Sequence, residues 1–147
     1  IALSHGAELL ILDEPTSGLD PIIRDEILDI FMDFIQEETR SIFVSTHIVE
    51  DLEKIADYIT FIHKGRILIS EEKDHLLERF VILKGPRERF ALFAPSELIG
   101  YKENRFGAEA MTEADTWRKK RKNAEGLTVE PVRIQDIMLY YVKGERL

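Results

Sequence analysis

The 147 residues are enough for one ordinary domain or two small ones, and an apolar fraction of 44% with a charged fraction of 33% is typical of globular proteins. The apolar runs are far too short to cross a bilayer, no secretory signal is visible, and the absence of cysteine excludes disulfides and thiolate metal sites. The net charge of -8 argues against nucleic-acid binding by the whole chain.

The start of the chain predicts a strand followed by a helix. Residues 1–8 have the pattern of a helix tail that ends at Gly6. Leu9–Asp13 is a run of four apolar residues before an acid, which predicts a strand buried on both faces. Asp20 before Pro21 predicts a helix start, with the aspartate as cap and proline at the first helical position. Apolar residues then recur at helical spacing, so one stripe of this helix should face a core: Ile23, Ile27, Ile30, Phe31 and Phe34.

The next elements complete a strand–helix–strand unit. Ser41–Thr46 predicts a second buried strand, and the spacing of the three elements indicates two parallel strands joined by a right-handed crossover. A further helix is predicted over residues 49–56. Tyr58–His63 and Arg66–Ser70 follow as two strands, and the Lys-Gly pair between them predicts a hairpin turn.

The last part of the chain predicts a small α+β domain. Phe80–Lys84 is a strand candidate that ends at Gly85-Pro86. Thr112 with Asp115 resembles a capping box that opens a short helix. A final amphipathic helix is predicted to end near Gly144 and to carry an apolar stripe: Ile134, Ile137, Met138, Tyr141 and Val142.

The predicted division into domains rests on the acidic, helix-prone connector over residues 71–78. We expect one domain over residues 1–75 and a second over residues 76–147. The second holds a basic tract, Trp117–Lys122, which has the composition to bind phosphates of nucleic acid or lipid. Such a run is more often the solvated end of a helix, where cations also interact favourably with the dipole, so no nucleic-acid partner is expected.

Two adjacent carboxylates at the end of the first strand indicate chemistry. Asp13 and Glu14 cannot lie in an apolar core without a metal, a hydrogen-bond donor or a phosphate-linked partner. Open α/β sheets bind ligands at the carboxyl ends of their strands, and His47 follows the second strand, so it should approach the same point. Asp13 is suited to hold Mg²⁺ through water, whereas Glu14 is suited to orient a water molecule. The chain contains no Gly-Lys dipeptide, so it has no phosphate-binding loop of the Gly-x-x-x-x-Gly-Lys-Ser/Thr kind.

Leu9–Asp20 and Ser45-Thr46-His47 together resemble the ATP-binding subunit of an ABC transporter. The matching parts occur in the family's order: Leu9–Asp13 is similar to the Walker B strand, Glu14 to the catalytic glutamate, Ser17-Gly18-Leu19-Asp20 to the D-loop, and His47 to the switch histidine. The resemblance covers about the first 75 residues. It implies an α/β fold, namely the carboxyl-terminal part of a P-loop NTPase core with parallel strands, followed by a small α+β domain.

The resemblance also implies ligands and roles. ATP would bind with Mg²⁺ at Asp13, Glu14 and His47 would be catalytic, and the D-loop would contribute ATP-binding residues, namely Ser17, Gly18 and Asp20. In the family the aspartate of the D-loop helps to link two ATP sites across a dimer. Simpler interpretations remain open, because a single acid can cap a helix, Gly18 can serve only a turn, and Asp20 can cap the helix that follows it.

The partners follow from the same resemblance. The segment Pro131–Met138 is similar to the carboxyl-terminal extension of bacterial ABC-2-type exporter ATPases, which favours export over import. The expected partners are a membrane permease subunit and a second ATPase subunit, at the cytoplasmic face of the membrane. The first residue is not Met and the phosphate-binding loop, glutamine loop and signature are missing, so we expect a fragment that is inactive alone and forms oligomers through exposed apolar sheet. The alternative is a non-catalytic regulatory or interaction module that retains half of a nucleotide site.

Overall fold

The computed structural model describes residues 6–144 of the chain. The chain divides into two compact units, Ile1–Ala56 and Asp57–Leu147. Most of the helix tail predicted over residues 1–8 lies outside the described residues. The domain boundary predicted between residues 75 and 76 falls inside the second unit, within a helix, and stays a prediction about domain organisation.

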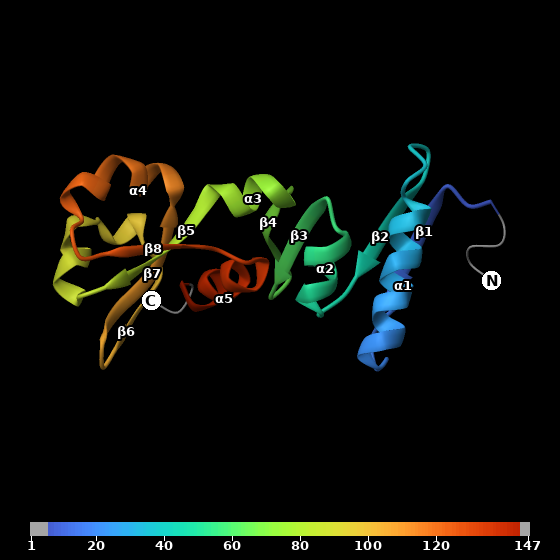
Figure 1. Cartoon of the computed structure of the whole chain (residues 1–147), viewed down its shortest axis with the longest axis horizontal. Coiled ribbons are helices and arrows are strands. Elements are labelled where there is room, and N and C mark those ends of the chain that lie inside the picture. Colours follow the sequence, from blue (N-terminus) through green and yellow to red (C-terminus); the bar gives the residue numbers. More distant parts are fainter. Residues whose placement is uncertain (1–5, 145–147) are drawn as a thin grey trace. The chain divides into compact units, whose positions relative to one another are not determined.

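From residue 6 onward, the first unit contains two strands and two helices in the predicted order (Figure 1): β1 Leu9–Asp13, α1 Pro21–Phe34, β2 Ser41–Ser45 and α2 Val49–Ile55. β1 and β2 pair in parallel, with Leu9 opposite Ser41 and Asp13 opposite Ser45. The aspartate before α1 caps it as predicted, and the helix buries three apolar side chains: Leu28, Phe31 and Phe34. This arrangement is mixed α/β, and it brings the ends of the two strands together at one edge.

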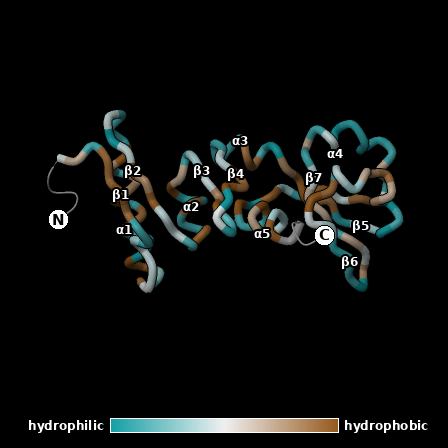
Figure 2. Tube along the Cα trace, turned by 180° about the vertical axis from the view of Figure 1, so that it is seen from behind, coloured by the Kyte–Doolittle hydropathy of each residue, from teal (hydrophilic) through white to brown (hydrophobic). Residues whose placement is uncertain are grey.

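The predictions that β1 is buried on both faces and that β2 is a buried strand are wrong. Along β1 only Leu10 is fully buried, whereas the side chain of Ile11 is 73% exposed and that of its partner Phe43 on β2 is 65% exposed. Figure 2 shows hydrophobic residues along β1. The physical reason is that alternate side chains of a strand point to opposite faces, and the unit supplies a helical layer for one face only.

The second unit opens with an antiparallel hairpin, β3 Tyr58–His63 and β4 Arg66–Glu72. Lys64 and Gly65 form its turn with φ values of 48° and 75°. Positive φ at both central residues is the geometry of a type I′ turn, which matches the twist of the flanking strands. The predicted hairpin is therefore confirmed. Of the predicted connector, Glu71 and Glu72 belong to β4, and the rest lies in α3, Lys73–Arg79.

A four-stranded antiparallel sheet in the order β6-β7-β5-β8 forms the rest of the second unit. The strands of this sheet are β5 Phe80–Gly85, β6 Ile99–Asn104, β7 Gly107–Glu113 and β8 Thr128–Pro131. The unit also contains the helices α4 Ala114–Lys120 and α5 Ile134–Gly144. Short 3-10 turns are present in the unit as well: η2 Arg87–Leu92, η3 Pro95–Glu97 and η4 Arg121–Asn123. Its core side chains are fully or almost fully buried: Phe80, Leu83, Ala110, Met111, Ile134 and Ile137. The predicted strand after the connector and the predicted final helix are thus both present.

The predicted capping box of Thr112 and Asp115 is wrong. Thr112 belongs to β7, is fully buried, and its hydroxyl donates to the carbonyl oxygen of Glu97 at 2.7 Å. Glu113 occupies the cap position of α4 and makes no side-chain capping bond. Thr112 does not cap α4, because the pairing of β7 with β5 and β6 holds Thr112 in the core of the sheet.

Within residues 6–144, no helix is both long enough and apolar enough to traverse a bilayer.

Candidate functional site

The predicted site residues lie where β1 and β2 end side by side. Asp13 stands opposite Ser45 in the parallel pair, and the hydroxyl of Ser45 donates to the carboxylate of Asp13. The backbone N–H of Glu14 donates to the carbonyl oxygen of Ser45 at 2.8 Å. These bonds extend the strand pairing by one residue, so the side chains that follow each strand are delivered to one point.

Glu14 and His47 meet at this edge. The Nδ1 atom of His47 lies 2.9 Å from both carboxylate oxygens of Glu14, and Thr46 Oγ1 lies 3.4 Å from Oε2. The side chains of His47 and Glu14 are 73% and 37% exposed, so a ligand in solvent has access to the pair. The predicted convergence of a carboxylate and an imidazole at the strand ends is therefore present, whereas their catalytic roles are untested.

The backbone of Glu14 has an uncommon conformation. Its φ of 46° lies in the left-handed region, which residues other than glycine rarely adopt. Such a conformation persists only when its surroundings hold it in place, and it occurs often at functional sites. Here it turns the chain immediately after β1, while the carboxylate remains hydrogen-bonded to His47.

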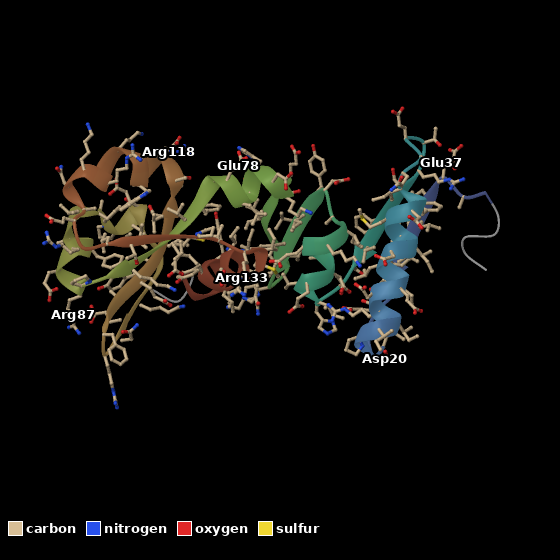
Figure 3. The ribbon with its side chains drawn as sticks, in the orientation of Figure 1. Asp20, Glu37, Glu78, Arg87, Arg118 and Arg133 are labelled. Atoms are coloured by element: carbon tan, nitrogen blue, oxygen red, sulfur yellow. The ribbon has the colours of Figure 1, made fainter. Side chains whose placement is uncertain are left out.

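The segment predicted as a D-loop forms a turn between β1 and α1. In this turn the Ser17 N–H donates to the Glu14 carbonyl oxygen at 3.2 Å. Gly18 has a φ of 77°, a backbone conformation that favours glycine. Asp20 caps α1, because its Oδ1 accepts the N–H groups of Ile22 at 3.0 Å and Ile23 at 3.2 Å. Figure 3 shows Asp20 at the start of that helix. The capping role is confirmed, whereas the ATP-binding roles of the serine, glycine and aspartate stay predictions.

A buried polar cluster beside the site was not anticipated from the sequence. Thr16 and Asp51 are only 1% and 2% exposed, and the threonine hydroxyl donates to Asp51 Oδ2. Arg24 Nε donates to Asp51 Oδ1 at 2.6 Å. This Thr16–Asp51–Arg24 cluster joins the turn after β1 to α2, which follows His47, so it fixes the two halves of the site relative to each other. The only sequence signal was an acid in the first turn of a short helix, and that signal does not name its partners.

The donors at the strand ends suit magnesium better than a transition metal. Asp13 offers an exposed carboxylate with the hydroxyl of Ser45 beside it, and oxygen ligands with retained water are what Mg²⁺ prefers. Across the described part of the chain, no cluster of three or more histidine, cysteine, aspartate or glutamate side chains is arranged to hold a metal ion. A metal ion at Asp13 would therefore take most of its ligands from outside these side chains.

Two of the five basic side chains in the predicted basic tract, Arg118 and Lys120, are engaged within their own unit. Arg118 pairs with Asp115 at 2.6 Å, and Lys120 pairs with Glu97 and donates to the carbonyl oxygen of Leu92 at 2.9 Å. These interactions agree with the interpretation of the tract as a solvated helix end.

Comparison with known proteins supports the resemblance found in the motifs. No family model matches the chain. It is 44% identical over 78 residues to the bacitracin transport ATP-binding protein BcrA of Bacillus licheniformis, a match that covers 53% of this chain and 26% of the relative. It is 45% identical over 74 residues to the lantibiotic transport ATP-binding protein SrtF of Streptococcus pyogenes, covering 50% and 32%. The energy-coupling factor transporter ATP-binding protein EcfA2 of Clostridium tetani is 45% identical over 65 residues, covering 44% and 23%.

These matches define what the chain is similar to. Over about half of its length it is similar to ATP-binding proteins of ABC transporters, and the predicted resemblance is confirmed. The chain spans only about a quarter to a third of the length of these relatives.

Proposed function

We propose that this chain is part of an ATP-hydrolysing subunit of an ABC transporter, which drives a membrane permease and works with a second ATPase subunit. The observation that carries the proposal is the Glu14–His47 pair at the ends of two parallel strands, with Nδ1 2.9 Å from the carboxylate. The similarity to ATP-binding proteins of transporters supports ATP binding and transport. The test is the rate of ATP hydrolysis with and without the carboxylate of Glu14.

The proposed mechanism assigns one task to each side chain. Asp13 would hold hydrated Mg²⁺, and the ion would neutralise charge on the phosphates. Glu14 accepts a hydrogen bond from the attacking water and orients it toward the γ-phosphate, because in-line positioning is most of what phosphoryl transfer requires. His47 keeps its Nδ1 on Glu14, so its Nε2 is the ring atom that would contact a γ-phosphate oxygen.

The direction of transport and the location belong to the same proposal. We infer an exporter from the similarity of Pro131–Met138 to the extensions of ABC-2-type ATPases. The subunit would lie at the cytoplasmic face of the membrane beside its permease. Asp20, at the exposed start of α1, would link two ATP sites across the subunit dimer.

We expect the 147-residue chain by itself to bind Mg·ATP negligibly. The chain has no Gly-Lys dipeptide, and the backbone N–H groups and lysine of a phosphate-binding loop supply most contacts to the β- and γ-phosphates. Isothermal titration calorimetry of the purified chain with Mg·ATP should show no saturable heat up to millimolar nucleotide. Micromolar affinity would contradict the assignment of this chain as half of a site. Adding the missing loop and signature without gaining binding would favour the alternative of an interaction module.

We also expect the isolated chain to self-associate through the exposed face of the β1–β2 pair. Ile11 and Phe43 stand opposite each other and are 73% and 65% exposed, and adjacent exposed apolar side chains on a two-stranded sheet favour association. The double variant Ile11→Ser, Phe43→Ser should shift the chain toward monomer in sedimentation velocity. Ile22→Ser is the matched control, since Ile22 is 72% exposed but lies on α1. A wild-type chain that sediments as a monomer at all concentrations would show the prediction to be wrong.

A further inference from the structure

The second unit holds a cavity that the proposed ATP site does not use. The cavity has a volume of about 750 Å³ and lies between η2, η3, β6 and α5. Small-molecule sites typically occupy roughly 300–1,000 Å³ and are lined mostly by apolar and aromatic side chains. The lining here has that character: Phe90, Phe93, Leu98, Ile99, Tyr101 and Tyr141. All of these residues belong to the unit Asp57–Leu147, so the inference does not rest on ATP hydrolysis.

The wall formed by η2 and η3 is fixed by polar contacts rather than by regular strand pairing. The Glu97 carboxylate accepts the N–H of Ala94 at 2.7 Å and pairs with Lys120, and the pair with Lys120 is the largest cause of a lowered pKa of Glu97. Lys120 also donates to the carbonyl oxygen of Leu92 at 2.9 Å, and Thr112 donates to that of Glu97 at 2.7 Å. Because these bonds hold the wall in place before any ligand arrives, little ordering is required on binding.

The floor of the cavity is continuous with the core of the unit. Phe90 and Phe93 are only 4% and 5% exposed and pack in one cluster with Leu83 and Ala110. The rings of Phe90 and Tyr101 meet edge to face, with centroids 5.4 Å apart and planes at 71°. Rigid aromatic rings in the wall of an open cavity favour a flat or compact ring system as ligand.

At the rim of the cavity lies Arg87, whose ion-pair partner Glu103 can be replaced by an acidic ligand. Arg87 Nη1 lies 3.3 Å from Glu103 Oε2, and the two side chains are 56% and 46% exposed, so the pair contributes little to stability. The Tyr101 hydroxyl donates to the other oxygen of Glu103 at 3.0 Å. Figure 3 shows Arg87 on the segment that joins β5 and β6. An acidic group on a ligand can take the place of the Glu103 carboxylate and form a charge-assisted bond with Arg87.

We propose that this cavity binds a small molecule with a flat ring body and one acidic group, with the rings against the half-buried Tyr101 and Tyr141 and the acid on Arg87.

The test compares two fluorescent dyes that share the same rings and differ in one acidic group. Anilinonaphthalene sulfonate carries the acid and phenylnaphthylamine does not. Both are titrated into the full 147-residue chain that carries Ile11→Ser and Phe43→Ser, so that the apolar face of β1 and β2 does not contribute. Arg87→Gln should weaken the sulfonate dye about fivefold and leave the neutral dye unchanged, whereas Glu103→Gln should tighten the sulfonate dye about twofold.

Two further variants separate this cavity from other surfaces. Ala91→Trp places an indole at the lining and should reduce binding of both dyes, whereas Arg89→Gln alters a neighbouring arginine outside the lining and should change neither. Circular dichroism verifies that each variant is folded. The proposal would be overturned if Ala91→Trp left the affinity of both dyes unchanged, or if neither dye bound. A chain that becomes monomeric only with Ala91→Trp would also overturn it, because a second copy would then occupy the cavity.

Discussion

Glu14→Gln is expected to reduce ATP hydrolysis by about 10²- to 10⁴-fold while leaving ATP binding intact. The comparison requires the protein in which these residues are joined to a phosphate-binding loop and a signature motif. The amide keeps the size of the side chain but presents only one acceptor oxygen, so it cannot both hold His47 and orient water as a carboxylate does. Phosphate release per site and nucleotide binding, measured on the same preparation, separate the chemical step from affinity.

A matched glutamate provides the control for this experiment. Glu37 is 61% exposed and pairs with Arg40 at 3.1 Å on the same unit, away from the strand ends. Glu37→Gln should therefore leave hydrolysis unchanged. Near-normal turnover in Glu14→Gln, with Glu37→Gln also normal, would refute the catalytic assignment of Glu14.

Asp51→Ala is expected to destabilise the first unit by about 3 kcal/mol. The substitution leaves the Thr16 hydroxyl without its acceptor in a site that is 1% exposed, and it removes the buried partner of the Arg24 guanidinium, which keeps only the exposed Glu50 at 3.7 Å. The value lies at the low end for broken buried pairs because the Arg24 side chain remains 27% exposed and can reach water. Trp117 lies in the second unit and its fluorescence would not report this loss, so amide hydrogen exchange of β1 and β2 is the suitable measurement.

The control for Asp51 is an exposed carboxylate that also links α1 to α2. Asp29 accepts from Lys54 at 2.7 Å, and Lys54 keeps a second partner in Asp25 at 2.6 Å, hydrogen bonds that raise the pKa of the lysine. Asp29→Ala should change the exchange rates little, because exposed ion pairs are screened by solvent. Equal protection of β1 and β2 in the Asp51 and Asp29 variants would contradict a positioning role for the buried cluster.

Local chemistry made several elements predictable. Asp20-Pro21 marks the start of α1 because its carboxylate satisfies two free N–H groups, and Lys64-Gly65 marks the hairpin because both residues adopt positive φ. Elements that depend on distant partners were missed. β6, β7 and β8 have no strong alternation of their own, and only pairing with β5 or with one another places them in the sheet.

The candidate site also contains one contact that the sequence predicted and one that it did not. The approach of Glu14 to His47 was predictable because parallel strands end at one edge of a sheet, and two short motifs named the residues. The link from Thr16 to Asp51 was not, since the two residues are 35 positions apart and no sequence pattern pairs them. The burial of β1 could not be predicted from the sequence either. A run of apolar residues shows that a strand is suited to burial, but it does not show which layers of the fold cover the strand.

The sequence by itself determined the identity and order of the motif residues, the caps and turns, and the resemblance to ATP-binding proteins of ABC transporters. The tertiary structure alone decided that Asp51 is the buried anchor between the two halves of the site, that Ile11 and Phe43 face outward, and that a cavity opens beside Phe90. The physical reason is range. Helix caps and turns depend on a few neighbouring residues, so the local sequence predicts them. Burial and long-range hydrogen bonds depend instead on which distant segments come to lie beside a given side chain.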